Sequence, residues 1–313
     1  MKLSELVGYL NLLDGIDLDL ECRSLMNKFQ AIEHTILNHP VQVGKLAGDF
    51  SHNLKNISDN ISGTQQDIDN IKNYVRRNIA ELEPVYYQNS HLLHQDEMLN
   101  RTAYMLLNRQ LRIGEDSELY LQSRLLRYTD WRVPGIIIRP GLEKFIEYLV
   151  PLDPLYLVDQ HQDLLDPAMQ RFPELYQRRL RPYVINELEH QDALWQLPNN
   201  QFGLIFAYNY FNFKPMEILR RYLDSMYNKL RPGGAVIFTF NNCDVAHGVA
   251  LAEGNFMCYT PRREIQAHAN SLGFEIVSGY RQARGDVTWL ELKKPGEIES
   301  IRGGQCLAKI VAT

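Results

Sequence analysis

The feature that most constrains this chain is a run of apolar residues spaced three or four apart between Val43 and Leu82. Steps of three and four alternate almost throughout, which is the spacing of a coiled-coil seam. About forty residues of continuous helix would extend roughly 60 Å, farther than a compact small domain covers by itself. Glycines within the run weaken the helix, so a partner helix must supply much of its stability. The seam consists of Val43, Leu46, Phe50, Leu54, Ile57, Ile61, Thr64, Ile68, Ile71, Val75, Ile79 and Leu82.

Two partners for this helix remain open. The preceding segment, apolar at Leu18, Leu25, Phe29, Ile32 and Ile36, folds back through His39-Pro40 as an antiparallel hairpin, or identical chains associate. Isoleucine at both seam positions favours three strands over two. We therefore predict a homo-oligomer through Val43 to Leu82, with a trimer favoured and a monomeric hairpin as the alternative. Residues 1–111 are predicted to be an all-helical, coiled-coil-like arm for oligomerisation or docking.

From about Arg112 the periodicity changes, and short β-branched or aromatic runs alternate with helical segments. This alternation predicts an α/β unit over residues 112–313, built on a Rossmann-like sheet of seven strands. The predicted strands are 135–138, 155–159, 183–186, 202–207, 235–240, 274–280 and 287–293. The predicted helices are 142–150, 167–180, 215–230 and 261–272, and a last apolar run at 305–311 is a further candidate edge strand.

Composition excludes several classes of protein. The net charge of −5 argues against a protein that coats nucleic acid. The four cysteines show no CxxC pairing, so neither a disulfide framework nor a zinc site is predicted. No stretch approaches the ~20 apolar residues that span a bilayer, so no membrane partner is expected. The expected location is the cytoplasm, including assembly there into a virus particle.

Several motifs occur in the order typical of class I S-adenosylmethionine-dependent methyltransferases. The most specific is Leu230-Arg231-Pro232-Gly233-Gly234, which resembles the family's turn before its fifth strand. Proline ends the preceding helix there, and the two glycines permit a tight turn into a buried strand. Upstream, Leu197-Pro198 and the strand Phe202 to Phe206 resemble the family's fourth-strand region. Downstream, the segments starting at Cys258 and at Ser271 resemble its last helix and the turn that follows.

The resemblance implies a set of residues that bind S-adenosylmethionine. Asp159 ends the second predicted strand, where a carboxylate accepts the ribose hydroxyls, and Gln160 follows it. Asp192 lies five residues before Leu197-Pro198, where the family contacts adenine. Its carboxylate would accept the exocyclic amine, while Ala193 or Leu194 packs on the ring.

The glycine-rich cofactor loop departs from the family pattern. Of the three expected glycines only Gly141 is present, because Arg139 and Glu143 replace the outer two and Ile137 replaces the expected acid. Glycine normally lets the backbone turn sharply beside the cofactor. Two interpretations follow: Arg139 binds the methionine carboxylate in an unusual working site, or the pocket is filled and the domain is a scaffold without chemistry.

The segment after the fourth predicted strand contains the candidate catalytic residues. Tyr208, Asn209 and Tyr210 lie where the family lines its acceptor pocket, although alternating aromatic residues at a strand end more often serve packing. The motifs of enzymes that methylate DNA bases are absent there. His91 and His94 have no opposing ligand set, so no metal site is predicted.

Together these features predict an S-adenosylmethionine-dependent methyltransferase that acts on an unidentified small molecule or protein. The alternative is a catalytically inactive methyltransferase-fold protein, such as a subunit of a virion or large complex, oligomerised by its N-terminal arm. Whether the protein is an enzyme therefore depends on the loop around Arg139.

Overall fold

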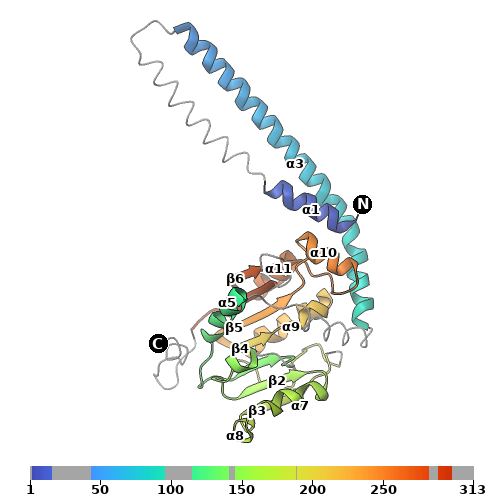
Figure 1. Ribbon diagram of the computed structural model, residues 1–313, viewed down its shortest axis with the longest axis vertical. Coiled ribbons are helices and arrows are strands. Elements are labelled where there is room, and N and C mark those ends of the chain that lie inside the picture. Colours follow the sequence, from blue (N-terminus) through green and yellow to red (C-terminus); the bar gives the residue numbers. More distant parts are fainter. Residues whose placement is uncertain are drawn as a thin grey trace. The chain divides into compact units, whose positions relative to one another are not determined.

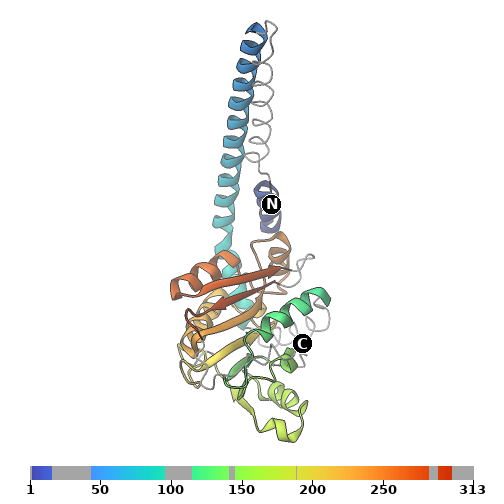
Figure 2. The same cartoon turned by 90° about the vertical axis from the view of Figure 1, so that its left-hand side faces the viewer.

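The computed structural model describes residues 2–15, 44–95, 115–140, 145–187, 189–281 and 288–297. The chain divides into two units, Met1–Pro84 and Val85–Thr313. The division falls ahead of residue 111, where the periodicity of the sequence changes. Figures 1 and 2 show the elements of each unit.

The N-terminal unit consists of helix α1 (Leu3–Asp14) and most of helix α3 (Gly44–Gln95). The predicted long helix is confirmed from Gly44 onward, and α1 lies alongside it (Figures 1 and 2). The carboxylate of Asp14 pairs with Lys72 at 3.3 Å and with Arg76 at 3.4 Å. The predicted partner segment from Leu18 to Ile36 lies outside the described residues, so association between chains stays a prediction.

Seven strands form one sheet in the order β3-β2-β1-β4-β5-β7-β6. Strands β1 to β5 run parallel to one another, and β7 is antiparallel to both β5 and β6. The predicted seven-stranded α/β architecture is thereby confirmed. The strands are β1 (Gly135–Ile138), β2 (Leu155–Asp159), β3 (Leu180–Val184), β4 (Phe202–Ala207), β5 (Leu230–Phe240), β6 (Glu275–Arg281) and β7 (Thr288–Lys293).

Helices cover both faces of the sheet, because its central strands are apolar on both sides. One face packs against α9 (Met216–Lys229) and α11 (Arg262–Leu272) through the cluster that includes Leu219, Tyr222 and Ile265. The other face packs against α5 (Glu115–Leu126), α6 (Phe145–Tyr148) and α7 (Gln162–Gln170). The remaining described helices are α8 (Glu174–Gln177), the short 3₁₀ helix η1 (Phe211–Phe213) and α10 (Ala246–Glu253). Within the described residues, no helix has both the length and the apolar character needed to cross a membrane.

Three elements depart most from the sequence prediction. Strand β3 begins at Leu180 rather than at residue 183; it is an edge strand, where exposed Pro182 is tolerated. The helix predicted over 167–180 is instead α7, which contains Pro167, followed by α8 after Pro173. Burial of Leu165 and Ala168 fixes α7 and outweighs the proline, which ordinarily costs a helix interior about 3 kcal/mol. Strand β5 begins at Leu230 rather than at residue 235. Its pairing with β4 is irregular between Phe202 and Leu204.

Candidate functional site

The strand order reverses between β1 and β4, because β2 and β3 lie on one side of this point and β5 on the other. Ligands of such sheets bind at this point, beyond the carboxyl ends of the strands. The residues that follow both strands have left-handed backbones although neither is glycine. Arg139 has φ 56° after β1, and Asn209 has φ 53° after β4. Such backbones cost free energy and concentrate at functional sites. This end of the sheet is therefore the candidate site.

Arg139 is held by the end of the neighbouring strand. Its backbone N–H donates to the carbonyl oxygen of Val158 at 2.7 Å, and its Nε donates to Asp159 Oδ2 at 3.2 Å. The other carboxylate oxygen of Asp159 accepts the backbone N–H of His161 at 3.1 Å. Asp159 is fully buried. The acid predicted to bind ribose is thus already paired with the side chain that replaces the loop glycine.

Glu187, just beyond β3, is the centre of a buried polar network. Its Oε1 accepts from Lys214 Nζ at 2.7 Å and lies 3.1 Å from His94 Nε2. Its Oε2 accepts from the hydroxyls of Tyr210 and Tyr222, each at 3.0 Å. The two hydroxyls also lie 2.7 Å apart, and each carries a single hydrogen, so the two tyrosines share two donated hydrogens among three contacts. Both oxygens of Glu187 therefore face buried donors within the domain.

The charges in this network shift one another's pKa values. Burial raises the pKa of Glu187, but the Lys214 ammonium and the contact with His94 outweigh it and hold that pKa well below the usual range. Burial lowers the pKa of Lys214, and the positive charge of Arg139 lowers it further against the opposing effect of Glu187. Burial raises the pKa of both Tyr210 and Tyr222 well above the usual value, so both hydroxyls are donors at neutral pH.

A cavity of about 810 Å³ opens beside this network. This volume lies within the range of small-molecule sites. Most of the residues that line it are charged or polar, and apolar side chains supply the rest of its wall. The lining residues are His91, His94, Gln95, Arg139, Gln160, His161, Leu164, Val184, Ile185, Asn186, Glu187, Glu189, Gln196, Phe213, Lys214 and Ile218.

The last turns of α3, residues 85–95, complete one wall of the cavity and belong to the α/β unit. Ser90 anchors them, since its hydroxyl accepts the backbone N–H of Tyr259 at 2.7 Å and donates to the carbonyl oxygen of Tyr86 at 2.8 Å. The ring of Tyr87 packs edge-on against that of Tyr259, with centroids 5.3 Å apart. His91 contacts Glu217 at 2.9 Å. These contacts hold His94 beside Glu187.

The predicted adenine-binding residues lie near the cavity but do not line it. Asp192 pairs with Lys229 at 2.8 Å and accepts the backbone N–H of Leu194 at 2.9 Å. Ala193 and Leu194 are buried in the apolar core. Their neighbours Glu189 and Gln196 do reach the cavity wall. Gly141 lies outside the described residues, so its predicted role stays untested.

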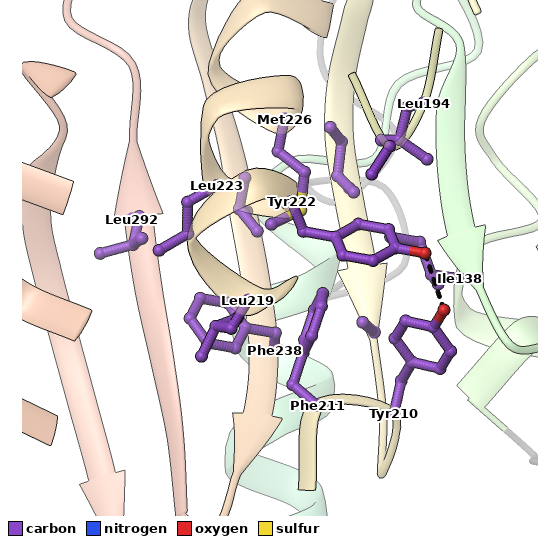
Figure 3. Close-up of a cluster of buried hydrophobic side chains, with 14 of the residues drawn as sticks. Ile138, Leu194, Tyr210, Phe211, Leu219, Tyr222, Leu223, Met226, Phe238 and Leu292 are labelled. Carbon is purple, nitrogen blue, oxygen red and sulfur yellow. Dashed lines mark hydrogen bonds between the residues drawn. The ribbon is translucent and has the colours of Figure 1, made fainter. Parts of the chain in front are cut away.

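The three candidate catalytic residues point into different surroundings, and none lines the cavity. Tyr208 packs against Phe145, with ring centroids 4.6 Å apart. The backbone N–H of Asn209 donates to Thr239 Oγ1 at 2.6 Å. Tyr210 enters the opposite apolar cluster, where its hydroxyl meets that of Tyr222 at 2.7 Å (Figure 3).

Sequence reasoning missed Glu187, Lys214 and Tyr222, which come from three separate segments and meet only after folding. From the sequence, His94 is a candidate only as a metal ligand together with His91. The described residues contain no cluster of three or more His, Cys, Asp or Glu suited to a metal ion. A lysine directly before a predicted helix, such as Lys214 before Pro215, carries no distinctive sequence signal.

No protein-family model matches the sequence, and no significant match occurs among curated proteins. Several solved structures of methyltransferases are similar to the fold. An S-adenosylmethionine-dependent methyltransferase from Mesorhizobium loti is 13% identical, over 56% of this chain and 97% of that one, with a TM-score of 0.46. The N-methyltransferase NodS from Bradyrhizobium japonicum, in complex with S-adenosyl-L-homocysteine, is 18% identical over 62% of this chain and 98% of that one, with a TM-score of 0.44. A geranyl diphosphate C-methyltransferase from Streptomyces coelicolor is 11% identical over 57% of this chain and 80% of that one, with a TM-score of 0.45.

Proposed function

We propose that the α/β unit binds S-adenosylmethionine and transfers its methyl group to a small molecule or protein. The observation that carries the proposal is the cavity of about 810 Å³ at the carboxyl ends of the parallel strands, bordered by Arg139 after β1 and Gln160 after β2. Ligands of doubly wound sheets bind at this position. The ordered motifs from Leu197 to Ser271 support the same family of function.

The side chains present suit the methionine end of S-adenosylmethionine better than its ribose. Arg139 lines the cavity, and a guanidinium binds a carboxylate well, as the methionine moiety would require. Asp159 does not line the cavity and is already paired with Arg139. Ribose binding by Asp159 would therefore require Arg139 to release it. Methyl transfer itself depends mainly on holding the acceptor in line, which a preformed cavity favours.

Titration calorimetry and thermal unfolding with S-adenosylmethionine and S-adenosylhomocysteine test the proposal. A ligand at 100 times its dissociation constant should stabilise the fold by about 2.7 kcal/mol. Binding of either ligand by the wild-type chain supports the proposal, and no shift at millimolar ligand contradicts it.

The variant Arg139→Gly separates the two roles of Arg139. Glycine accepts the left-handed backbone at this position without strain. If Arg139 holds the cofactor carboxylate, the variant binds more weakly than the wild type. If Arg139 instead blocks Asp159, the variant binds more tightly, and adding Asp159→Asn abolishes that gain.

A second candidate is a non-catalytic domain within an oligomer or large complex. The buried ion pair between Arg139 and Asp159 favours it, because that pair engages the acid the cofactor would need. The buried partners of both Glu187 oxygens favour it too. In this case the arm from Val43 to Leu82 assembles the chains, as a trimer, and the α/β unit binds without chemistry.

A further inference from the structure

One lysine lines the cavity, and its side chain is buried there. Lys214 lies directly before Pro215, the N-cap of α9, and is the only lysine among the described residues of the cavity wall. Its side chain is 5% exposed. Its Nζ contacts Glu187 Oε1 at 2.7 Å and Gln160 Oε1 at 3.2 Å. An ammonium carries three hydrogens, so within the described part of the chain these oxygens leave one position of the nitrogen for a ligand.

The surroundings of Lys214 favour its neutral amine more than water does. Burial lowers the pKa of Lys214, and the positive charge of Arg139 lowers it further; together they outweigh the opposing charge of Glu187. The two cations share one aromatic neighbour, since the Arg139 guanidinium carbon lies 4.9 Å and Lys214 Nζ 4.8 Å from the ring centroid of Tyr210. A lysine that is desolvated beside a second cation is activated as a nucleophile.

Glu187 is placed to take the proton that Lys214 must lose before it reacts. Its Oε2 and the hydroxyls of Tyr210 and Tyr222 form a triangle with contacts of 3.0, 3.0 and 2.7 Å. The two hydroxyls point toward each other (Figure 3). They supply two hydrogens for three contacts, so a hydrogen on Oε2 would complete the triangle. The nucleophile therefore lies 2.7 Å from a base that other side chains orient, which is the arrangement of covalent catalysis.

The ion pair keeps the neutral amine a minor form at rest. Against the effect of burial, the Lys214 ammonium holds the pKa of Glu187 well below its usual range. Once protonated, Glu187 is therefore a strong acid that readily returns the proton. Such an acid suits the second half of imine formation, in which a hydroxyl must be protonated to leave as water.

We propose that Lys214 forms an imine with the aldehyde or ketone group of a small ligand in the cavity, and that Glu187 accepts and returns the proton. The proposal goes beyond methyl transfer, because no methyl donor takes part in forming the imine. Lysine forms such imines with carbonyl substrates. The cavity of about 810 Å³ has room for a small molecule beside the amine.

The step balances without a further reactant. Lys214 passes one proton to Glu187, and the lone pair of the neutral amine attacks the carbonyl carbon while the π pair of the C=O bond moves to oxygen. That oxygen takes a proton from the attacking nitrogen, which gives a carbinolamine. Glu187 then protonates the hydroxyl, the C–O bond breaks to release water, and the nitrogen lone pair closes the C=N bond. The protonated imine keeps a positive charge beside ionised Glu187, so the ion pair is restored.

Reductive trapping with propanal and sodium cyanoborohydride, on the full chain at neutral pH, tests the proposal. Hydride from the reagent reduces the imine to a secondary amine, so the nitrogen keeps a propyl group that peptide mass spectrometry locates. We expect Lys214 to be labelled about a hundredfold faster than exposed Lys2 and Lys55, which is the lower end of what one positioned acid–base group contributes. Labelling of Lys214 no faster than that of these two lysines would overturn the proposal.

A second buried lysine provides the matched control. Lys229 is 2% exposed and pairs with Asp192 at 2.8 Å, but it does not line the cavity. It should stay unlabelled, and Lys229→Arg should leave the labelling of Lys214 unchanged. Lys214→Arg keeps a positive charge beside Glu187 but cannot form an imine, so the intact protein should lose its fast label. Equal labelling of Lys214 and Lys229 would show that buried lysines react wherever they lie, which would overturn the site.

The outcomes distinguish this proposal from the proposed function. Calorimetry with S-adenosylhomocysteine on protein that has not met the aldehyde reports cofactor binding alone. Cofactor binding without a fast label at Lys214 would support the methyltransferase and overturn the imine. A fast label without cofactor binding would support the imine and contradict the methyltransferase. The labelling of the wild type decides the proposal even where Lys214→Arg does not fold.

Discussion

Arg139 Nε lies 3.2 Å from Asp159 Oδ2, so a buried ion pair joins the carboxyl ends of the adjacent strands β1 and β2. The arginine adopts a left-handed backbone at the position where a glycine was expected. Where a loop glycine was expected, the chain has an arginine whose side chain is held by this ion pair. Whether the domain binds the cofactor or serves only as a scaffold therefore depends on this ion pair.

Replacing Arg139 with methionine should lower the free energy of unfolding by about 3 kcal/mol, because Asp159 would be left buried without its partner. Methionine keeps the same backbone strain, so the loss reports the ion pair. The double variant Arg139→Met with Asp159→Asn should recover most of this stability. Urea unfolding of the four proteins in a double-mutant cycle measures the coupling. Strictly additive effects would show that the pair contributes nothing.

The stability of the α/β unit should depend on the ionisation of Glu187 at acid pH. Its pKa is held well below the usual range in the folded protein. Its contribution is therefore complete above roughly pH 4 to 5, where an unfolded glutamate titrates, and is lost as the pH falls toward the folded pKa. Glu187→Gln should be less stable at pH 7 and should lose less stability than the wild type between pH 6 and 3.

Urea midpoints across this range of pH measure the effect. The control is the same substitution at Glu275, an exposed residue of β6 outside the site. A Glu187→Gln profile parallel to that of the wild type would contradict the assignment.

Ser90 should anchor the end of α3 to the α/β unit. In Ser90→Ala the buried backbone N–H of Tyr259 loses its acceptor, which should cost about 1 to 3 kcal/mol. Exposed Ser271 serves as the control position, where alanine should change stability by no more than about 0.5 kcal/mol. Chemical denaturation of both variants measures the difference, and hydrogen exchange over residues 85–95 should increase only in Ser90→Ala. Unchanged exchange there would refute the anchoring role.

Ile71 distinguishes a single-chain hairpin from an oligomer. Within one chain Val75 and Ile79 are 7% and 6% exposed, whereas the Ile71 side chain, on the same predicted seam, is 51% exposed. A lysine at this position should hardly change the stability of a monomer. In a trimer it would place three charges in the seam and dissociate the chains. Sedimentation equilibrium of the wild type and of Ile71→Lys measures the number of chains in each. A trimeric wild type and a dissociated variant are expected, and a monomeric wild type would rule out the predicted trimer.

The sequence by itself determined the elements whose residues carry a local signal. The period of three and four residues up to Leu82 predicted the long helix, because such a pattern places one apolar stripe on a helix. The apolar strands β1, β2 and β4 were predicted to the residue, since they are buried on both faces. The edge strand β3 was misplaced because its exposed Arg181 and Pro182 obscure that pattern.

Only the tertiary structure decided what surrounds the site. Asp159 and Arg139 were both identified from their positions after strands, but their pairing depends on the lateral order of β1 and β2. Glu187, Lys214, Tyr222 and His94 are distant in sequence and meet because α3, α9 and the sheet enclose one polar network. Local propensity reports how a segment folds, whereas buried charges are compensated by partners that only the packing of the whole domain brings together.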